Sequence, residues 1–182
     1  MRIIAGSAGG LPLQNPPDGV RPTMDRVRGA IFSSLGELVP GAVVLDLFAG
    51  SGAMGLEAMS RGASAATFVE SDERCVRCIQ TNLRRTSLPG SVQRMDAHRF
   101  LELYGGEDAF DLIFADPPYA KKPGDPDHAV ALAGSAALAA SLRPSGLFVL
   151  ERQISRAVPV STLELIRTKR YGGSEVLYFR RP

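Results

Sequence analysis

The chain lacks several features that would place it in a special class of protein. It has no tryptophan and two histidines in 182 residues. Because it has two cysteines, it cannot carry the several bridges of a small disulfide-stapled secreted domain. No stretch approaches the roughly 20 apolar residues of a membrane-spanning helix. The N-terminus "MRIIAGSAGG" has a three-residue apolar run, too short for a secretory signal. We therefore expect a cytoplasmic protein with no membrane association.

An excess of one charge sign is lacking as well. Lysine and arginine total 21 against 19 aspartate and glutamate, a formal net charge of +2 that does not describe a strongly basic nucleic-acid-binding protein. An apolar content of 45% is too high for a disordered chain and sufficient for one sizeable core at this length. The composition predicts one globular domain and leaves its partners open.

Glycine and proline are abundant near the N-terminus, where the sequence has little periodicity. We therefore expect residues 1–22 to form an N-terminal arm and residues 23–182 to form the domain. A helix should open the domain, because Thr23 is a plausible N-cap and apolar residues recur at helical spacing between Val27 and Leu38.

The rest of the chain alternates strand-like and helical segments. Strands are expected at 42–48, 65–70, 91–95, 110–116 and 146–151, and helices at 52–61, 72–86, 97–104 and 128–142. Strands separated by helical connections of this length form βαβ units, which indicates the α/β class with a parallel sheet. Two last strand-like segments, 161–168 and 174–180, flank the turn "KRYGG" and predict an antiparallel hairpin.

A glycine-rich motif follows the strand expected at 42–48. The run "GSGAMG" from Gly50 to Gly55 satisfies G-x-G-x-x-G between a strand and a helix. Glu70 comes twenty residues after Gly50 and ends the next strand, where it can accept hydrogen bonds from ribose hydroxyls. A plain strand-to-helix turn is the alternative, but strand, helix and acid together favour an adenosine-type ligand.

Two classes of ligand share this layout, a dinucleotide and S-adenosylmethionine. Asp46 lies four residues before Gly50, where it would repel a pyrophosphate but suit the amino end of methionine, so it favours S-adenosylmethionine. Asp96, after the third strand, could accept a bond from the adenine amino group or cap the following helix.

The stretch "FDLIFADPPYAKK" (110–122) begins like a buried strand and ends differently. Acids and prolines after an apolar run are common turn residues. However, Pro117 and Pro118 form a stiff segment with the Asp116 carboxylate at one end and the Tyr119 ring at the other. Taken alone, this stretch leaves a turn and a chemical role both open.

Other reactive or charged residues have plain structural explanations. Cys75 and Cys78 have C-x-x-C spacing but fall in a helical stripe with no second cysteine pair, and His98 and His128 lack metal-ligand spacing, so no metal is expected. Further basic residues could form an RNA track or an ordinary charged surface. They are Arg84, Arg85, Arg167, Lys169 and Arg170.

Several motifs together resemble one known family. The combination of "RPTMDRVRGAIF", "LDLFAGSGAMGLEAMSRGA", "FVE", "DPPY", "LFVLE" and "RYGGSEVLYF" is similar to the bacterial RsmD-type 16S ribosomal RNA (guanine-N2) methyltransferase family over nearly the whole chain. The resemblance implies a Rossmann-like class I methyltransferase with a seven-stranded, mostly parallel sheet and a C-terminal antiparallel hairpin. It also implies methyl transfer from S-adenosylmethionine to the exocyclic N2 amine of a guanine in 16S ribosomal RNA.

With that donor, the motifs give a candidate set of site residues. The Asp116 carboxylate and the Pro117 carbonyl would accept hydrogen bonds from the target amine, and Tyr119 would stack on the extruded base. The candidate catalytic residues are Asp116, Pro117, Pro118 and Tyr119. The candidate cofactor residues are Asp46, Phe48, Gly50, Ser51, Gly52, Glu70, Asp96 and Ala97. The candidate substrate contacts are Arg21, Arg26, Arg28, Lys121 and Lys122.

The chain departs from the family in its arm, and other functions stay open. It has "SAGGLPL" where the family usually has basic residues after "RIIAG", and Gly29 where the family's helix usually reads "REA". An adenine-N6 methyltransferase acting on DNA or RNA would use the same "DPPY". A dinucleotide-binding oxidoreductase is disfavoured by Asp46, and a binding module without catalysis by the intact "DPPY". The expected partner is ribosomal RNA, free or in an assembled small-subunit particle, and a monomer is expected.

Overall fold

A computed structural model describes residues 1–16, 25–119, 122, 124–154 and 160–181. The chain forms two compact units, Met1–Ala97 and His98–Pro182. The described residues hold seven strands and six α-helices, in the alternation that the sequence predicted.

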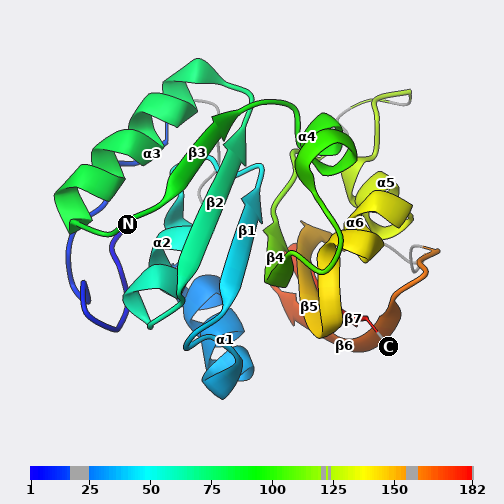
Figure 1. Ribbon diagram of the computed structural model, residues 1–182, viewed down its shortest axis with the longest axis horizontal. Helices are drawn as coiled ribbons and strands as arrows, with labels where there is room; N and C mark the ends of the chain where they lie inside the picture. The colour runs from blue at the N-terminus through cyan, green and yellow to red at the C-terminus, as the bar shows by residue number, and fades with distance from the viewer. Residues whose placement is uncertain (17–24, 120–121, 123, 155–159, 182) are drawn as a thin grey trace. The chain divides into compact units, whose positions relative to one another are not determined.

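The first unit contains three parallel strands with a helix after each of the first two. β1 (Val43–Leu47) pairs with β2 (Ala65–Glu70), and β2 pairs with β3 (Ser91–Arg94). α2 (Ala53–Ser60) packs on β1 and β2, and α3 (Glu73–Thr86) packs on β2 and β3 (Figure 1). These are two consecutive βαβ connections, so the polar edge at the carboxyl ends of the strands is where a ligand site is expected.

The helices of the first unit differ in how much of their surface is buried and in how they begin. Every residue of α2 is buried, as in a helix that lies inside the core. α3 is amphipathic and begins at the Asp72 N-cap, whose carboxylate accepts a hydrogen bond from the Arg74 N–H at 2.8 Å. α1 (Asp25–Leu35) buries Val27 and Leu35 as predicted.

The second unit contains four strands. β4 (Phe110–Ala115) pairs in parallel with β5 (Leu142–Gln153). β7 (Ser174–Arg180) lies antiparallel between β5 and β6 (Glu164–Tyr171), so the order in this unit is β4-β5-β7-β6. α4 (Ala97–Tyr104) precedes β4. Two short helices, α5 (His128–Ala133) and α6 (Ala136–Ser141), pack on β5.

Two predicted elements differ in the structure. The helix expected over 128–142 is two helices, α5 (His128–Ala133) and α6 (Ala136–Ser141), because Gly134 ends the first and the Ser135 side chain caps the second. The hairpin strand expected over 161–168 is shifted, with the two-residue turn at Gly172 and Gly173. Gly172 has φ 58°, which glycine adopts without strain.

The predicted α/β class, with mostly parallel strands and a C-terminal antiparallel hairpin, is confirmed. The arm boundary expected at residue 22 lies outside the described residues. No helix in the described ranges is both long enough and apolar enough to cross a bilayer.

Candidate active site

The loop between β1 and α2 has an unusual backbone. Gly50 and Gly52 have φ 56° and 78°, so the glycines occupy positions where a side chain would be strained. Phe48 also has a positive φ, 55°, although it carries a side chain. A non-glycine residue in this region costs about 1–3 kcal/mol, and such residues cluster at functional sites. We call residues Phe48–Gly52 the glycine loop.

Glu70 at the end of β2 holds this loop. The Gly50 N–H donates a hydrogen bond to Oε2 of Glu70 at 2.9 Å, and the Asp72 N–H donates to Oε1 at 2.9 Å. Each carboxylate oxygen can accept more than one hydrogen bond, and the residue is only half-buried. Glu70 can therefore support the loop and still accept bonds from a ligand.

Asp46 on β1 is almost fully buried, with an exposed fraction of 3%. Its Oδ2 accepts a hydrogen bond from the Gly55 N–H at 2.9 Å, in the first turn of α2. A carboxylate is favourable at a helix N-terminus, because the free N–H groups there carry partial positive charge. The same groups bind the pyrophosphate in dinucleotide-binding proteins, so a protein carboxylate here takes one of the donors that a pyrophosphate would use.

The other predicted cofactor residues of the first unit differ in exposure. Ser51 is buried, and its carbonyl accepts a hydrogen bond from the Asn82 side chain at 3.0 Å. Asp96 is exposed in the link between β3 and α4, and Ala97 is buried. The first unit thus carries all eight predicted cofactor residues, on β1, on the glycine loop, at the end of β2 and where the chain passes from β3 to α4.

The "DPPY" stretch lies in the second unit, directly after β4. Asp116 and Tyr119 are half-buried, Pro117 is buried and Pro118 is exposed. This run of partly accessible side chains differs from the buried strand before it. The chemical role of the four residues stays a prediction.

The predicted substrate contacts have different outcomes. Arg21 and Lys121 lie outside the described residues. Arg26 and Lys122 are exposed, and the Lys122 backbone N–H donates to Oδ2 of Asp125 at 2.9 Å. Arg28 has no exposed surface, so its predicted role as an RNA contact is wrong.

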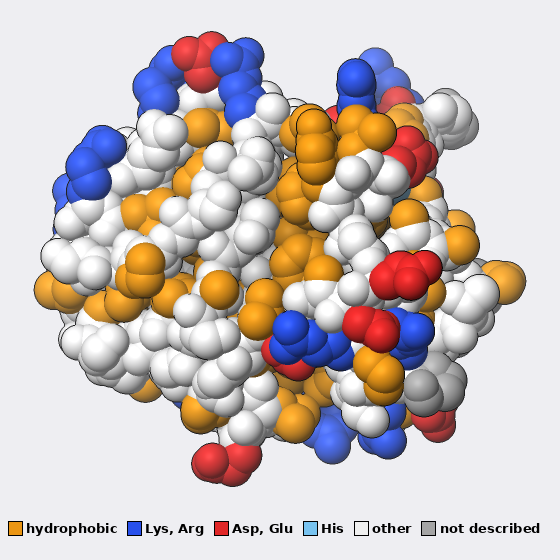
Figure 2. Space-filling view, in the orientation of Figure 1, with side chains coloured by type: hydrophobic (Ala, Val, Ile, Leu, Met, Phe, Trp, Pro, Cys, Tyr) orange, Lys and Arg blue, Asp and Glu red, His pale blue; other side chains and the backbone are white. Residues whose placement is uncertain are grey.

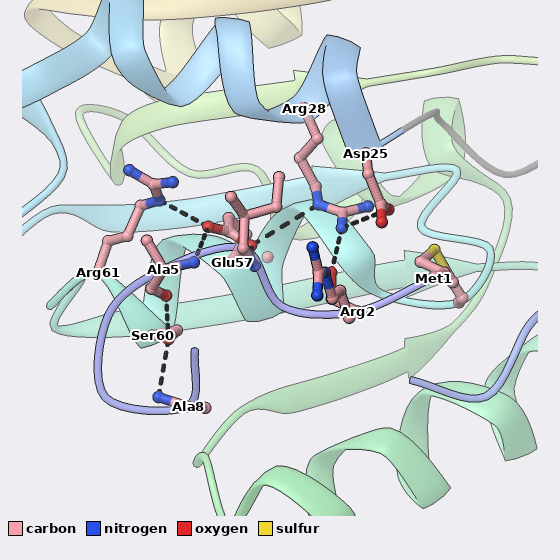
Figure 3. A network of polar contacts seen from close by, with 12 residues as sticks. Met1, Arg2, Ala5, Ala8, Asp25, Arg28, Glu57, Ser60 and Arg61 are labelled. Carbon is pink, nitrogen blue, oxygen red and sulfur yellow. Dashed lines mark hydrogen bonds and ion pairs between the residues drawn. The ribbon is translucent and has the colours of Figure 1, made fainter. Parts of the chain in front are cut away.

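Arg28 instead belongs to a buried ionic network centred on Glu57 (Figure 3). Its guanidinium lies 3.7 Å from Glu57 and 3.0 Å from Asp25, and it donates a hydrogen bond to the Arg2 carbonyl. Arg61 forms a second ion pair with Glu57 at 2.7 Å. A buried carboxylate requires such partners, because charge is costly to move out of water.

The same network fixes the start of the chain on α2. The backbone N–H groups of Ile4 and Ala5 donate to Glu57 at 2.7 and 3.1 Å. The Ser60 hydroxyl donates to the Ala5 carbonyl at 2.6 Å and accepts from the Ala8 N–H at 3.0 Å (Figure 3). We call residues 1–16 the N-terminal segment. Its hydrogen bonds reach α2 near its start and α3 near its end.

On the face that Figure 2 shows, lysine and arginine side chains lie in separate small groups, several of them beside acidic side chains. Near the start of α3, Arg77 and Arg94 both pair with Glu73, at 2.5 and 3.2 Å. Arg85 donates to the Pro12 carbonyl at 3.4 Å. On the face shown, therefore, the described lysine and arginine side chains do not form one dense basic patch.

The cysteines are structural, as predicted, and the histidines form a contact that the sequence did not predict. Burial raises the pKa of the Cys75 thiol to about 11 and also raises the pKa of Cys78. Nε2 of His98 and Nδ1 of His128 lie 3.0 Å apart, although 30 positions separate them in sequence. No periodicity or motif could have indicated that pair. Among the described residues, no three metal-ligating side chains are grouped as a metal site would require.

Comparisons with known proteins cover the whole chain. The family model described as "Conserved hypothetical protein 95" matches residues 1–180. YlbH of Bacillus subtilis, provisionally named an rRNA methyltransferase, is 41% identical over 65% of this chain and 67% of its own length. "Ribosomal RNA small subunit methyltransferase D" of Escherichia coli K12 is 39% identical over 65% of this chain and 60% of its own length. The matches thus span about two thirds or less of these relatives.

Solved structures match over more of the length. Escherichia coli yhhF, provisionally named a methyltransferase, is 32% identical with a TM-score of 0.83, covering 100% of this chain and 97% of that one. A Thermus thermophilus 16S rRNA N2 methyltransferase in complex with AdoMet and guanosine is 26% identical with a TM-score of 0.69. That match covers 91% of this chain and 44% of the other. The predicted Rossmann-like class I methyltransferase fold is confirmed.

Proposed function

Since the chain belongs to the family described as "Conserved hypothetical protein 95", the RsmD-type family that its motifs resemble, we propose that it methylates small-subunit ribosomal RNA. The reaction is transfer of a methyl group from S-adenosylmethionine to the exocyclic N2 amine of a guanine in 16S rRNA. Membership carries the reaction class, and the chemistry of the described residues supports the donor and the acceptor.

The observation that carries the choice of donor is the buried carboxylate of Asp46 on the Gly55 N–H. It makes the start of α2 a poor place for the two negative charges of a pyrophosphate. Its neighbour across the loop, Glu70, is a second carboxylate, and residues 46–52 include no lysine or arginine. This donor set fits a ligand with a cationic sulfonium, a free amino group and ribose hydroxyls, and it disfavours an oxidoreductase that uses a dinucleotide.

When bound, S-adenosylmethionine supplies an electrophilic methyl group on a positively charged sulfur. Glu70 is proposed to accept hydrogen bonds from the ribose hydroxyls while it holds Gly50. Asp46 would favour the positive end of the methionine moiety, and Asp96 would accept a bond from the adenine amine. The loop backbone, with positive φ at Phe48, Gly50 and Gly52, is proposed to contact the ligand directly.

The "DPPY" stretch is proposed to hold the target amine. An exocyclic amine of a base is a poor nucleophile because its lone pair is delocalised into the ring. The Asp116 carboxylate and the Pro117 carbonyl would accept its N–H bonds and stabilise the positive charge that develops on nitrogen, and Tyr119 would stack on the flipped base. A carbon–nitrogen bond forms as the carbon–sulfur bond breaks, and one amine proton then passes to solvent.

Guanine N2 is favoured over adenine N6 by the family resemblance and by the solved relative whose complex contains guanosine, at 26% identity. The "DPPY" chemistry itself does not distinguish the two amines. The proposed partner is therefore ribosomal RNA, either free or within a small-subunit particle.

The test is transfer of labelled methyl from S-adenosylmethionine onto RNA, small-subunit particles and DNA prepared from cells that lack the protein. We expect label in small-subunit RNA, recovered as N2-methylguanosine. Label recovered as N6-methyladenosine, or only in DNA, would overturn the guanine assignment.

A variant tests the role of Asp116. Asp116→Ala should bind S-adenosylmethionine nearly as the parent does, while methyl transfer falls by about 10² or more, as for loss of a preorganised electrostatic partner. Tyr119→Phe, which keeps the ring, is the matched control and should retain most activity. A folded Asp116→Ala protein with parental methyl transfer would remove Asp116 from the mechanism.

A further inference from the structure

One buried side chain joins the N-terminal segment to the glycine loop. Asn82 on α3 has no exposed surface. Its Oδ1 accepts a hydrogen bond from the Gln14 N–H at 2.7 Å, and its Nδ2 donates to the Gln14 carbonyl at 3.1 Å and to the Ser51 carbonyl at 3.0 Å. Both polar atoms of the amide are used, and they connect positions 14, 51 and 82, which lie far apart in sequence.

Three further contacts involve the same parts of the chain. The Cys78 thiol, one turn before Asn82, donates to the carbonyls of Gln14 and Asn15 at 3.5 and 3.3 Å. The Ser51 hydroxyl lies 3.8 Å from the Met1 sulfur. The N-terminal segment therefore reaches the glycine loop directly at its first residue, and through Asn82 near its other end.

The backbone conformation of the glycine loop requires support from its surroundings. Three of its five residues have positive φ, which the strand and helix on either side do not impose. A backbone in this form persists only when its surroundings over-determine it. Ser51 is the residue between the two glycines of positive φ, so the bond to its carbonyl restrains the loop at its centre.

We propose that Asn82 is a positioning residue for the glycine loop. Through Asn82, ordering of the N-terminal segment is coupled to the affinity for the cofactor. This rests on the proposed function, which places S-adenosylmethionine at the glycine loop. Release of Gln14 would leave Oδ1 of Asn82 without its donor and remove one acceptor from Nδ2. The bond that Nδ2 still makes to the Ser51 carbonyl would then be held less firmly, which weakens the restraint on Ser51. Because coupling between two sites is reciprocal, cofactor binding would in turn favour the ordered segment.

The test uses an isosteric change with a matched control on the same helix. Asn82→Asp keeps an acceptor for the Gln14 N–H but loses the Nδ2 donor and places negative oxygen toward two carbonyls. Thr86→Ala is the control, because Thr86 is also buried and its hydroxyl donates to the carbonyls of Asn82 and Leu83 within α3, with no bond to the N-terminal segment or the glycine loop among the described residues. Both proteins are compared at equal distance from their melting temperatures.

Two measurements separate loop positioning from simple loss of stability. Amide hydrogen exchange across Gly50–Ala53 in the ligand-free protein should be faster in Asn82→Asp than in Thr86→Ala. Calorimetric titration with S-adenosylmethionine should show affinity reduced about tenfold or more in Asn82→Asp alone, the result of losing one buried hydrogen bond. Parental exchange in the loop, or parental affinity, in a folded Asn82→Asp protein would overturn the proposal.

A variant of the segment itself tests the coupling. Gln14→Pro removes the N–H that Asn82 accepts, without touching the loop. We expect faster loop exchange and weaker binding of S-adenosylmethionine here too, and unchanged values would refute the coupling. If the parent protein does not bind S-adenosylmethionine at all, the proposed function fails, and the exchange data still decide whether Asn82 positions the loop.

Discussion

The glycine loop and the N-terminal segment are held by the same kind of interaction, but the two acids that make it have different roles. In each, a glutamate carboxylate accepts backbone N–H groups of an irregular, glycine-containing stretch: Glu70 for Gly50, and Glu57 for Ile4 and Ala5. Glu70 is half-buried at the end of a strand, whereas Glu57 is fully buried.

The difference in burial decides the role of each acid. The buried Glu57 pairs with two arginines that balance its charge, and this keeps Arg28 in the interior, where it cannot contact RNA. Glu70 remains accessible and can serve a ligand as well as the loop. A carboxylate that binds backbone amides is thus a structural anchor when buried and a candidate binding group when it lies at a strand end.

The largest effect should come from removing the buried anchor. Glu57→Ala leaves Arg28 partly unpaired and two backbone N–H groups without an acceptor, so the free energy of unfolding should fall by about 3–5 kcal/mol. Urea denaturation measures this. Glu73→Ala is the matched control, because Glu73 is exposed although it also pairs with two arginines, and its loss should cost at most about 1 kcal/mol. Equal costs for the two variants would contradict the distinction.

The accessible acid should behave in the opposite way. Glu70→Ala should weaken binding of S-adenosylmethionine by about 1–3 kcal/mol, because ribose hydroxyls lose a charged acceptor. Isothermal titration calorimetry measures the affinity, and the melting temperature of the ligand-free protein shows whether the fold is kept. Strong destabilisation with unchanged affinity would make Glu70 an anchor like Glu57.

Two glycines sharpen the comparison further. A Cβ at Gly55, in the helix after the glycine loop, would lie 2.4 Å from the Phe68 ring, so Gly55→Ala should destabilise by about 1–3 kcal/mol. A Cβ at Gly29, beside the N-terminal segment, would meet Ile4 at an ordinary 3.6 Å. Gly29→Ala should therefore stabilise the protein by about 0.4–1 kcal/mol. Thermal unfolding of both variants gives the sign of each change in stability. A change of the same sign in both variants would contradict the difference in packing at the two glycines.

The smallest effect concerns the cysteines beneath these two regions. Cys78 lies under the N-terminal segment, whereas Cys75 has no contact with it among the described bonds. In Glu57→Ala, alkylation of Cys78 by iodoacetamide should quicken more than that of Cys75, because the segment is loosened. Peptide mass spectrometry resolves the two sites. Equal acceleration would indicate general unfolding instead.

The pH dependence of the Cys75 thiol has a definite sign. Its pKa rises from 9.0 in the unfolded chain to about 11 in the folded protein because burial disfavours the thiolate. The stability that the neutral thiol contributes is complete below pH 9.0 and is lost as pH rises toward 11. In Cys75→Ala, the free energy of unfolding should therefore fall less between pH 9.0 and about 11 than it does in the parent protein.

Much of this could be predicted from local patterns. Strand and helix periodicity gave the α/β class and nearly every element, and the glycine motif with Asp46 and Glu70 located the loop. What failed depended on contacts between distant positions. Nothing in "DRVR" distinguishes the buried Arg28 from the exposed Arg26, because the partner Glu57 comes from α2. No local rule pairs Asn82 with Gln14 and Ser51 either. Most hydrogen-bond partners of the N-terminal segment lie 50 or more residues away in sequence, so no local pattern indicates them.

The most direct test is calorimetric titration of the protein with S-adenosylmethionine, with its demethylated product and with NAD. We expect binding of the first two at one site per chain and none of NAD, because Asp46 and Glu70 place two carboxylates beside the glycine loop. Tight binding of NAD with no response to S-adenosylmethionine would contradict the account.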